Sequence, residues 1–274
     1  MCNNQIIPQA LTIASTDSGG GAGIGADIKT FQMRRVFGCL VVASVTAQNT
    51  LGVFDIHQLS SESITAQLQA VSEDFNIQAC KIGMLGDAQA IEAVAQGLKR
   101  FNFGTVVLDP VMVAKSGAVL LADEALSTLK NKLLPLADII TPNLQEAVRL
   151  TNLQITNAVE CEKAARIIQG LGVHTVIIKG GHSNNSTSEH CVDWVFSGDN
   201  APFSVQAKRY HTRHTHGTGC TFSACLTAEL AKGVPLLDAV QIAKDFITTA
   251  ISTPLDIGSG SGPVNHWAYQ DLKI

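Results

Sequence analysis

The chain has 274 residues, of which 46% are hydrophobic and only 15% are charged, so it can bury a large core and is unlike a disordered chain. Its 19 Lys and Arg residues and 23 Asp and Glu residues give a net charge of −4, which argues against general nucleic-acid binding. No apolar run reaches the roughly 18 residues that span a bilayer. The N-terminal segment also lacks the basic region of a signal peptide, so we expect neither a membrane span nor a signal peptide.

Seven cysteines are spread irregularly along the chain, without a CxxC pair. An odd number with no regular spacing indicates neither a disulfide framework nor a zinc site. The three histidines of the segment 211–216 would suit a metal only if they shared a strand face, and we do not expect zinc there. We therefore expect a cytoplasmic protein, with most thiols buried as small hydrophobic groups.

Short β-type runs alternate with amphipathic stretches along the chain. Strands are predicted at residues 10–15, 40–46, 81–84, 105–109, 138–141 and 174–179. Helices are predicted at residues 24–33, 64–75, 91–101, 120–134, 144–150, 161–169, 221–232 and 236–249. The segment 193–210 is less regular and suits a hairpin or edge strands, and residues 182–189 suit a mobile loop.

This alternation with short connections predicts an α/β fold with a mainly parallel sheet and helices on both faces. Several strand runs are apolar throughout, as expected where both faces of a strand are buried. Without a repeat or a low-complexity linker, we interpret residues 1–274 as one domain. In such a sheet, ligands bind beyond the carboxyl ends of the strands, and the polar motifs fall there.

The first motif, STDSGGGAGIGAD, follows a predicted strand and opens a helix at residues 15–27. Its glycines would let the backbone approach a ligand and expose N–H groups, which suits a substrate or phosphate loop. The loop lacks the GKS or GKT ending of a Walker P-loop, and no acid ends the next strand as in a dinucleotide fingerprint. Asp27 could contact a ligand hydroxyl or simply favour the helix N-terminus. A flexible turn is the alternative interpretation.

The second motif, HTHGTGCTFSA, places Gly217, Thr218, Gly219 and Cys220 before an apolar helix. Successive N–H groups at such a turn form an anion hole that would stabilise a transferring phosphoryl group. A thiol at a helix start is expected to have a lowered pKa, so Cys220 could take a proton from a substrate hydroxyl. The alternative is a buried structural cysteine, and we favour this for Cys225.

Two further groups of polar residues follow predicted strands. Asp109 closes TVVLD, and TPNLQE supplies Asn143 and Glu146; their oxygens suit Mg²⁺ directly or through water. Taken singly, each suits a helix cap or a solvated acid, but together they favour a metal–triphosphate site. Lys179 in KGGH could meet nucleotide phosphates, although a surface lysine beside a turn is the alternative.

From Ala10 to His266 the chain resembles the hydroxymethylpyrimidine/phosphomethylpyrimidine kinases of thiamine biosynthesis, within the ribokinase-like superfamily. The resemblance rests on TDSGGGAGIGADIKTF, VTAQNT, KIGML, DPVMVAKSG, LLPLADIITPNLQEA, KGGH and HGTGCTFSA, in this order. It implies a three-layer α/β/α sandwich, which is commonly dimeric in this family. The implied activity is ATP-dependent phosphorylation of 4-amino-5-hydroxymethyl-2-methylpyrimidine and then of its monophosphate.

The resemblance also assigns roles to individual residues. It implies that Gln48 recognises the pyrimidine edge, because an amide carries both a donor and an acceptor. It implies that Ala22, Asp27, Met84 and Val111 complete the substrate pocket, and that Cys220 is the catalytic base beside the anion hole 217–219. Asp109 and Glu146 match the magnesium side, and Asn143 and Lys179 the ATP side.

The chain departs from the usual loop AGTDPSGGAG, since it reads ASTDSGGGAG and places Ser15 near the substrate where the family has glycine. A pyridoxal or pyridoxine kinase is the nearest alternative, because its substrate is also a methylated heteroaromatic ring with a primary alcohol. Gln48 favours the pyrimidine, since relatives specialised for vitamin B6 tend to carry an apolar residue there. A non-catalytic binding domain is disfavoured by the intact Cys220, Asp109 and GTG turn, and a sugar kinase by Cys220.

Overall fold

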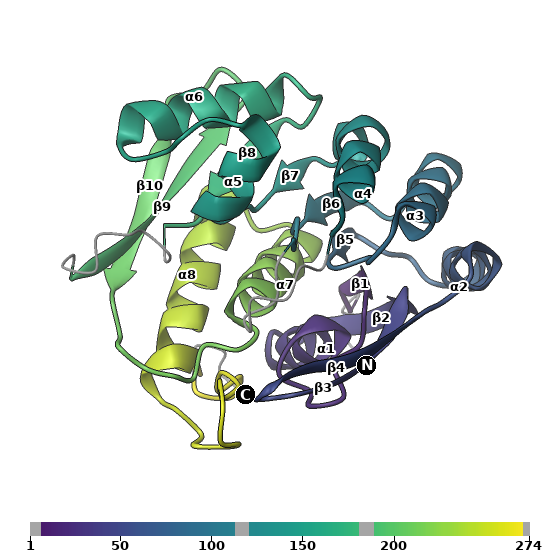
Figure 1. Cartoon of the computed structure of the whole chain (residues 1–274), viewed down its shortest axis with the longest axis horizontal. Helices are drawn as coiled ribbons and strands as arrows, with labels where there is room; N and C mark the ends of the chain where they lie inside the picture. The colour runs from purple at the N-terminus through teal and green to yellow at the C-terminus, as the bar shows by residue number, and fades with distance from the viewer. Residues whose placement is uncertain (1–6, 113–120, 181–188, 271–274) are drawn as a thin grey trace, which may run out of the picture.

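The computed structural model describes residues 7–112, 121–180 and 189–270. The strands of its large sheet are β1 (Gln9–Ala14), β2 (Phe37–Val42), β5 (Ala79–Ile82), β6 (Thr105–Leu108), β7 (Ile139–Ile140), β8 (Thr175–Ile178), β9 (His190–Ser197) and β10 (Phe203–Lys208). Within the described residues their order is β10-β9-β8-β7-β6-β5-β1-β2 (Figure 1). Strands β2 to β8 pair in parallel, whereas β9 and β10 form the antiparallel edge hairpin that the sequence allowed.

Helices cover both faces of this sheet, which confirms the predicted three-layer arrangement (Figure 1). One face carries α1 (Gly23–Met33), α7 (Thr218–Ala231) and α8 (Leu236–Ser252). The other carries α2 (Ser61–Asp74), α3 (Ala88–Arg100), α4 (Asp123–Thr128), α5 (Leu144–Thr151) and α6 (Ala158–Gln169). Helix α7 is buried along most of its length because it lies between α1, α8 and the sheet. Among the described residues, no helix combines the length and apolar character that crossing a membrane requires.

The predicted strand 40–46 is wrong, because the chain leaves the large sheet at Ala43. There the Ala43 N–H bonds to Ala14 and the Ala43 carbonyl accepts from Leu59, so the sheet cannot continue. Residues beyond it form a separate antiparallel pair, β3 (Ser44–Asn49) and β4 (Gly52–Gln58). Strand β4 has no apolar alternation, and most of its side chains are exposed, so the sequence pattern gave no signal for it.

Two other predicted boundaries are also wrong. The strand predicted at 81–84 lies two residues earlier, since β5 starts at Ala79, pairs there with β1 and β6, and buries Lys81. The helix predicted at 120–134 is α4 followed by a π-helical turn and a 3₁₀ turn, because Pro135 cannot continue a regular helix. Its first residue, the predicted loop 182–188, Cys2 and part of DPVMVAKSG lie outside the described residues.

The C-terminal segment fastens the β3–β4 hairpin to the rest of the molecule, as Figure 1 shows. The backbone N–H of Ser261 donates to the Thr50 carbonyl at 2.8 Å, and the Gly260 N–H donates to the Thr50 hydroxyl at 3.2 Å. A side chain at position 260 would collide with the Thr50 carbonyl oxygen, so this close approach requires glycine. The hairpin that carries Gln48 is thereby held at both of its faces.

Candidate active site

A cavity of about 580 Å³ lies where the carboxyl ends of the parallel strands meet the loops before α1 and α7. With one exception, Asp27, every predicted site residue lines it. These lining residues are Ser15, Ala22, Gln48, Met84, Asp109, Val111, Asn143, Glu146, Lys179, Gly217, Thr218, Gly219 and Cys220. Two more residues of the KGGH motif, Gly181 and His182, lie outside the described residues. The structure therefore brings together motifs that are up to 205 positions apart (Ser15 to Cys220).

Asp109 and Lys179 form the polar centre of this cavity. The Lys179 Nζ lies 2.9 Å from Asp109 Oδ1, which also accepts from the Thr141 hydroxyl at 3.2 Å. The Ser223 hydroxyl donates to Asp109 Oδ2 at 3.1 Å. Burial opposes ionisation, but Lys179 and Lys81 hold the pKa of Asp109 below its usual range. Asp109 is thus an ionised carboxylate held in place from three sides.

The glycine turn before α7 faces this pair. Gly217 has φ +81°, and a side chain there would collide with the Gly21 carbonyl, so only glycine fits between the two loops. A Cβ atom at Gly219 would lie 3.5 Å from Lys179 Nζ and 3.6 Å from Asp109 Oδ2, so this turn stands directly against the ion pair. An anion at the start of α7 would therefore meet both the helix N-terminus and the lysine.

Cys220 lines the cavity in the first turn of α7, where the backbone N–H of Gly23 bonds to its thiol. The expected fall in its pKa is wrong. Burial raises the pKa of the Cys220 thiol, the carboxylates of Asp27 and Asp109 raise it further, and Lys81 opposes them only in part. The residue is placed as predicted, but at neutral pH it is a thiol.

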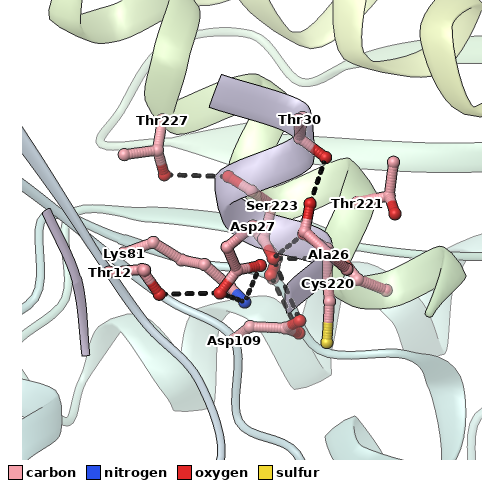
Figure 2. A network of polar contacts seen from close by, with 12 residues as sticks. Thr12, Ala26, Asp27, Thr30, Lys81, Asp109, Cys220, Thr221, Ser223 and Thr227 are labelled. Atoms are coloured by element: carbon pink, nitrogen blue, oxygen red, sulfur yellow. Dashed lines mark hydrogen bonds and ion pairs between the residues drawn. The ribbon is translucent and has the colours of Figure 1, made fainter. Parts of the chain in front are cut away.

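Asp27 does not contact the cavity, which corrects its predicted role as a substrate-binding residue. Its side chain has no exposed surface, and both carboxylate oxygens bond to Lys81 Nζ, at 2.6 and 2.8 Å. The Thr12 hydroxyl adds a third bond at 2.6 Å. Figure 2 shows this network beside Asp109 and Cys220. Burial opposes the lysine charge, but Asp27 holds the pKa of Lys81 above its usual range. Asp27 neutralises a lysine in the cavity wall.

The first glycine loop is folded around Asp17. One carboxylate oxygen accepts from the Gly19 N–H at 2.8 Å, and the other accepts from Gly21 at 3.0 Å and Ala22 at 2.9 Å. The same oxygen lies 2.8 Å from His216 Nε2. Because Asp17 occupies these N–H groups, the structure favours the substrate interpretation of this loop over the phosphate one.

Gln48 reaches the cavity from strand β3. The pairing of β3 with β4 shifts register between Ala47 and Gln48, and such a bulge changes the direction in which a side chain projects. The Gln48 backbone bonds in both directions to the Ser18 hydroxyl, at 2.7 and 2.8 Å. Ser15, the departure from the family loop, is bonded to the Ser44 hydroxyl and the Met84 carbonyl. Its hydroxyl is therefore already partnered within the protein.

Asn143 and Glu146 form a capping box at the start of α5. The Asn143 side chain accepts from the Glu146 N–H at 2.9 Å, and Glu146 accepts from the Asn143 N–H at 2.8 Å. Burial raises the pKa of Glu146 to about 7, and nearby Asp109 adds to this effect. The two carboxylates repel each other in a buried place, which a cation would relieve. In the described residues no cluster of three metal-binding side chains occurs, so the set fits Mg²⁺ that takes its other ligands from phosphate and water.

Four further residues of the cavity wall were missed by the sequence interpretation. Asp17, Lys81 and His216 stand inside motifs that were noted, but nothing in their spacing shows which side chain they meet. Asp193 and Lys244 form an ion pair of 2.8 Å at the far end, and Asp193 also accepts from the Gly180 N–H that follows Lys179. Only the pairing of β8 with β9 brings these segments together.

Known proteins share this arrangement. A model of the family described as phosphomethylpyrimidine kinase matches residues 17–265. A hydroxymethylpyrimidine/phosphomethylpyrimidine kinase from Haemophilus influenzae is 62% identical over 266 residues, which are 97% of this chain and 99% of that protein. The solved phosphomethylpyrimidine kinase from Clostridium difficile has a TM-score of 0.79 at 40% identity, covering 89% of this chain and 99% of that chain.

Pyridoxal kinases share the fold as well. The structure from Staphylococcus aureus in complex with pyridoxal has a TM-score of 0.88 at 32% identity, covering 97% of this chain and 96% of that chain. The backbone therefore does not separate the two activities, whereas sequence identity does. Since the family model spans most of the chain and the Haemophilus relative has nearly the same length, this chain belongs to the phosphomethylpyrimidine kinase family, with a ribokinase-like fold.

Proposed function

We propose that this protein uses ATP to phosphorylate 4-amino-5-hydroxymethyl-2-methylpyrimidine, and then its monophosphate to the diphosphate, for thiamine biosynthesis. The observation that carries the proposal is that one cavity joins the Gln48 amide to Lys179, Asp109 and the glycine turn 217–219. An amide suits the pyrimidine edge, and the cationic end suits phosphate. Relatives of both sequence and structure carry this activity in their names.

The substrate ring lies, in this proposal, between the apolar side chains of Ala22, Met84 and Val111, with its edge on Gln48. Ser15 stands behind this pocket and, through its bond to Ser44, joins the first loop to strand β3. Its hydroxyl fixes the wall rather than the substrate. The pocket is thus flat and mostly apolar, with one amide to orient the ring.

Phosphoryl transfer takes place at the start of α7. The N–H groups of the turn 217–219 and the Lys179 ammonium stabilise the charge that spreads over the transferring group. Cys220 receives the proton of the substrate hydroxyl. Because its pKa is raised, the thiolate is scarce at neutral pH, so we assign it a modest share of the rate.

ATP lies along Asn143 and Lys179, toward the ion pair of Asp193 and Lys244. Asp109 and Glu146 would hold Mg²⁺. When bound, this ion neutralises phosphate charge and aligns the triphosphate. The chain itself provides the two carboxylates and keeps Asp109 ionised and fixed in place.

We further propose a cytoplasmic homodimer. All six described cysteines are free thiols, which suits a reducing compartment. Strands β2 to β4 leave five large apolar side chains exposed, namely Phe37, Leu40, Val45, Phe54 and Ile56. Light scattering on the purified protein tests the dimer, and Phe54→Glu should shift it to a monomer.

The function is tested by measuring ATP consumption with Mg²⁺ and three substrates in turn: the hydroxymethylpyrimidine, its monophosphate, and pyridoxal. Products are identified by mass. The diphosphate from the pyrimidine, with pyridoxal much slower, is the expected result. Fast pyridoxal turnover without the diphosphate would establish the vitamin B6 alternative, and no turnover with any substrate would favour a binding domain.

A further inference from the structure

The Gln48 amide lies between two polar groups that belong to different segments. Its Nε2 is 3.5 Å from His216 Nε2, and its Oε1 is 3.3 Å from the Thr46 hydroxyl. All three residues line the cavity. The backbone of Gln48 is fixed by Ser18, so the freedom that remains is in its side chain.

The hydrogen on His216 can be located by its partner. His216 Nε2 lies 2.8 Å from Asp17 Oδ2, and Asp17 already accepts three backbone N–H groups. A carboxylate held by so many donors is ionised and has no hydrogen to give. The imidazole must therefore carry a hydrogen on Nε2, so it faces Gln48 as a donor.

The hydrogen on Thr46 is committed in the same way. Its hydroxyl lies 2.8 Å from the Thr16 carbonyl, which can only accept. Thr46 therefore presents a lone pair to Gln48. With Nε2 toward His216 and Oε1 toward Thr46, two donors face each other and two acceptors face each other. Half a turn of the amide about its last torsion leaves the atomic positions nearly unchanged and satisfies both neighbours.

We propose that Asp17 and His216 are positioning residues that hold Gln48 in this orientation, with Oε1 toward His216 and Nε2 toward Thr46, and that this fixes which pyrimidines the kinase accepts. The inference rests on the proposed pyrimidine kinase function. A 4-aminopyrimidine offers a donor on its amine and an acceptor on its ring nitrogen. A 4-oxopyrimidine, with hydrogen on that nitrogen, offers the reverse.

A freely rotating glutamine would match either edge, because its amide can turn to suit each. A locked glutamine matches only one, and the other leaves a donor and an acceptor unpaired in the cavity. Discrimination between the 4-amino substrate and its 4-oxo analogue therefore measures the lock, and loss of fold or of general affinity does not.

The experiment compares kcat/KM for the 4-amino substrate and the 4-oxo analogue in the wild type, in His216→Phe and in Thr46→Val. The wild type should prefer the 4-amino compound by about a hundredfold or more. In both variants this ratio should fall by about tenfold or more, because the amide is free to turn. The second variant acts from the other side of Gln48, so the test does not depend on one substitution.

His214→Phe is the matched control, since this histidine stands two residues away and pairs with Asp256 instead. Its ratio should stay at the wild-type value. A ratio within twofold of wild type in both test variants, or a wild type without preference, would overturn the lock alone. A wild type that does not phosphorylate the 4-amino compound would overturn the proposed function, and the inference with it.

Discussion

Two lysine–aspartate pairs lie on neighbouring strands below the cavity, and they differ in what surrounds them. The pair of Lys81 and Asp27 has no exposed side-chain surface, and Thr12 adds a further bond to its carboxylate. The pair of Lys179 and Asp109 is joined by one contact of 2.9 Å, and 14% of the Lys179 side chain is exposed to the cavity. The same two residue types thus form a closed pair and an open one.

The difference lies in where the lysine can go. Lys81 would leave Asp27 as an unpaired buried charge if it turned toward a ligand, which is costly. Lys179 can turn toward phosphate, because Asp109 keeps its bonds to Thr141 and Ser223 and lies near Lys81. We expect the closed pair to govern stability and the open pair to govern activity. The predictions below test this division.

Lys81→Met should have the largest effect, lowering the free energy of unfolding by roughly 3–5 kcal/mol because Asp27 is left unpaired. Denaturant unfolding measures this. The double variant Lys81→Met, Asp27→Leu removes both charges and should recover most of the loss. A single variant as stable as the wild type would show that the pair is not closed.

Lys179→Met should lower kcat/KM by about 10²–10³-fold, since a charge that stabilises the transferring group is lost. The free energy of unfolding should fall by roughly 1–2 kcal/mol only. Steady-state kinetics with parallel denaturant unfolding separates the two quantities. An equal loss of stability in Lys179→Met and Lys81→Met would erase the distinction between the pairs.

Two threonines give a smaller, matched comparison. The Thr12 hydroxyl bonds to Asp27 at 2.6 Å, and the Thr141 hydroxyl bonds to Asp109 at 3.2 Å. Thr12→Val should lower the free energy of unfolding by about 2 kcal/mol, and Thr141→Val by about 1 kcal/mol or less. Only Thr141→Val should also change kcat. The reverse pattern in unfolding and kinetics would contradict the comparison.

Cys220 lies between the pairs and should give the smallest effect. Because burial raises its pKa, little thiolate exists at neutral pH, and Cys220→Ala should lower kcat by only about tenfold. The rate of alkylation by iodoacetamide should rise with pH above 9 in the wild type. A loss of 10³-fold or more would restore the base to a central role.

Much of the fold could be predicted because buried parallel strands and amphipathic helices leave periodic patterns. The apolar run 105–109 and the stripe of α3 both produced the expected elements. Strand β4 left no such pattern, since its side chains are mostly exposed and it is held by pairing with β3 and by Thr50. Lys81 also interrupted an apolar strand and hid its true start.

The site was predictable as a set of motifs but not as a set of contacts. Asp109, Lys179 and the turn 217–219 meet as expected, because parallel strands bring their carboxyl ends to one edge. The role of Asp27 was misplaced, since a helix periodicity does not show that a lysine 54 residues away lies under it. The pKa of Cys220 failed for the same reason, because burial outweighed the helix start.

The fastening of Thr50 by Gly260 and Ser261 joins positions about 210 residues apart. During synthesis, β1 to β8 can pair before the last helix leaves the ribosome, but this fastening cannot form until the final segment has emerged. The hairpin that presents Gln48 is thus completed last. A nascent or prematurely terminated chain would hold the phosphate end of its cavity while still unable to choose its substrate.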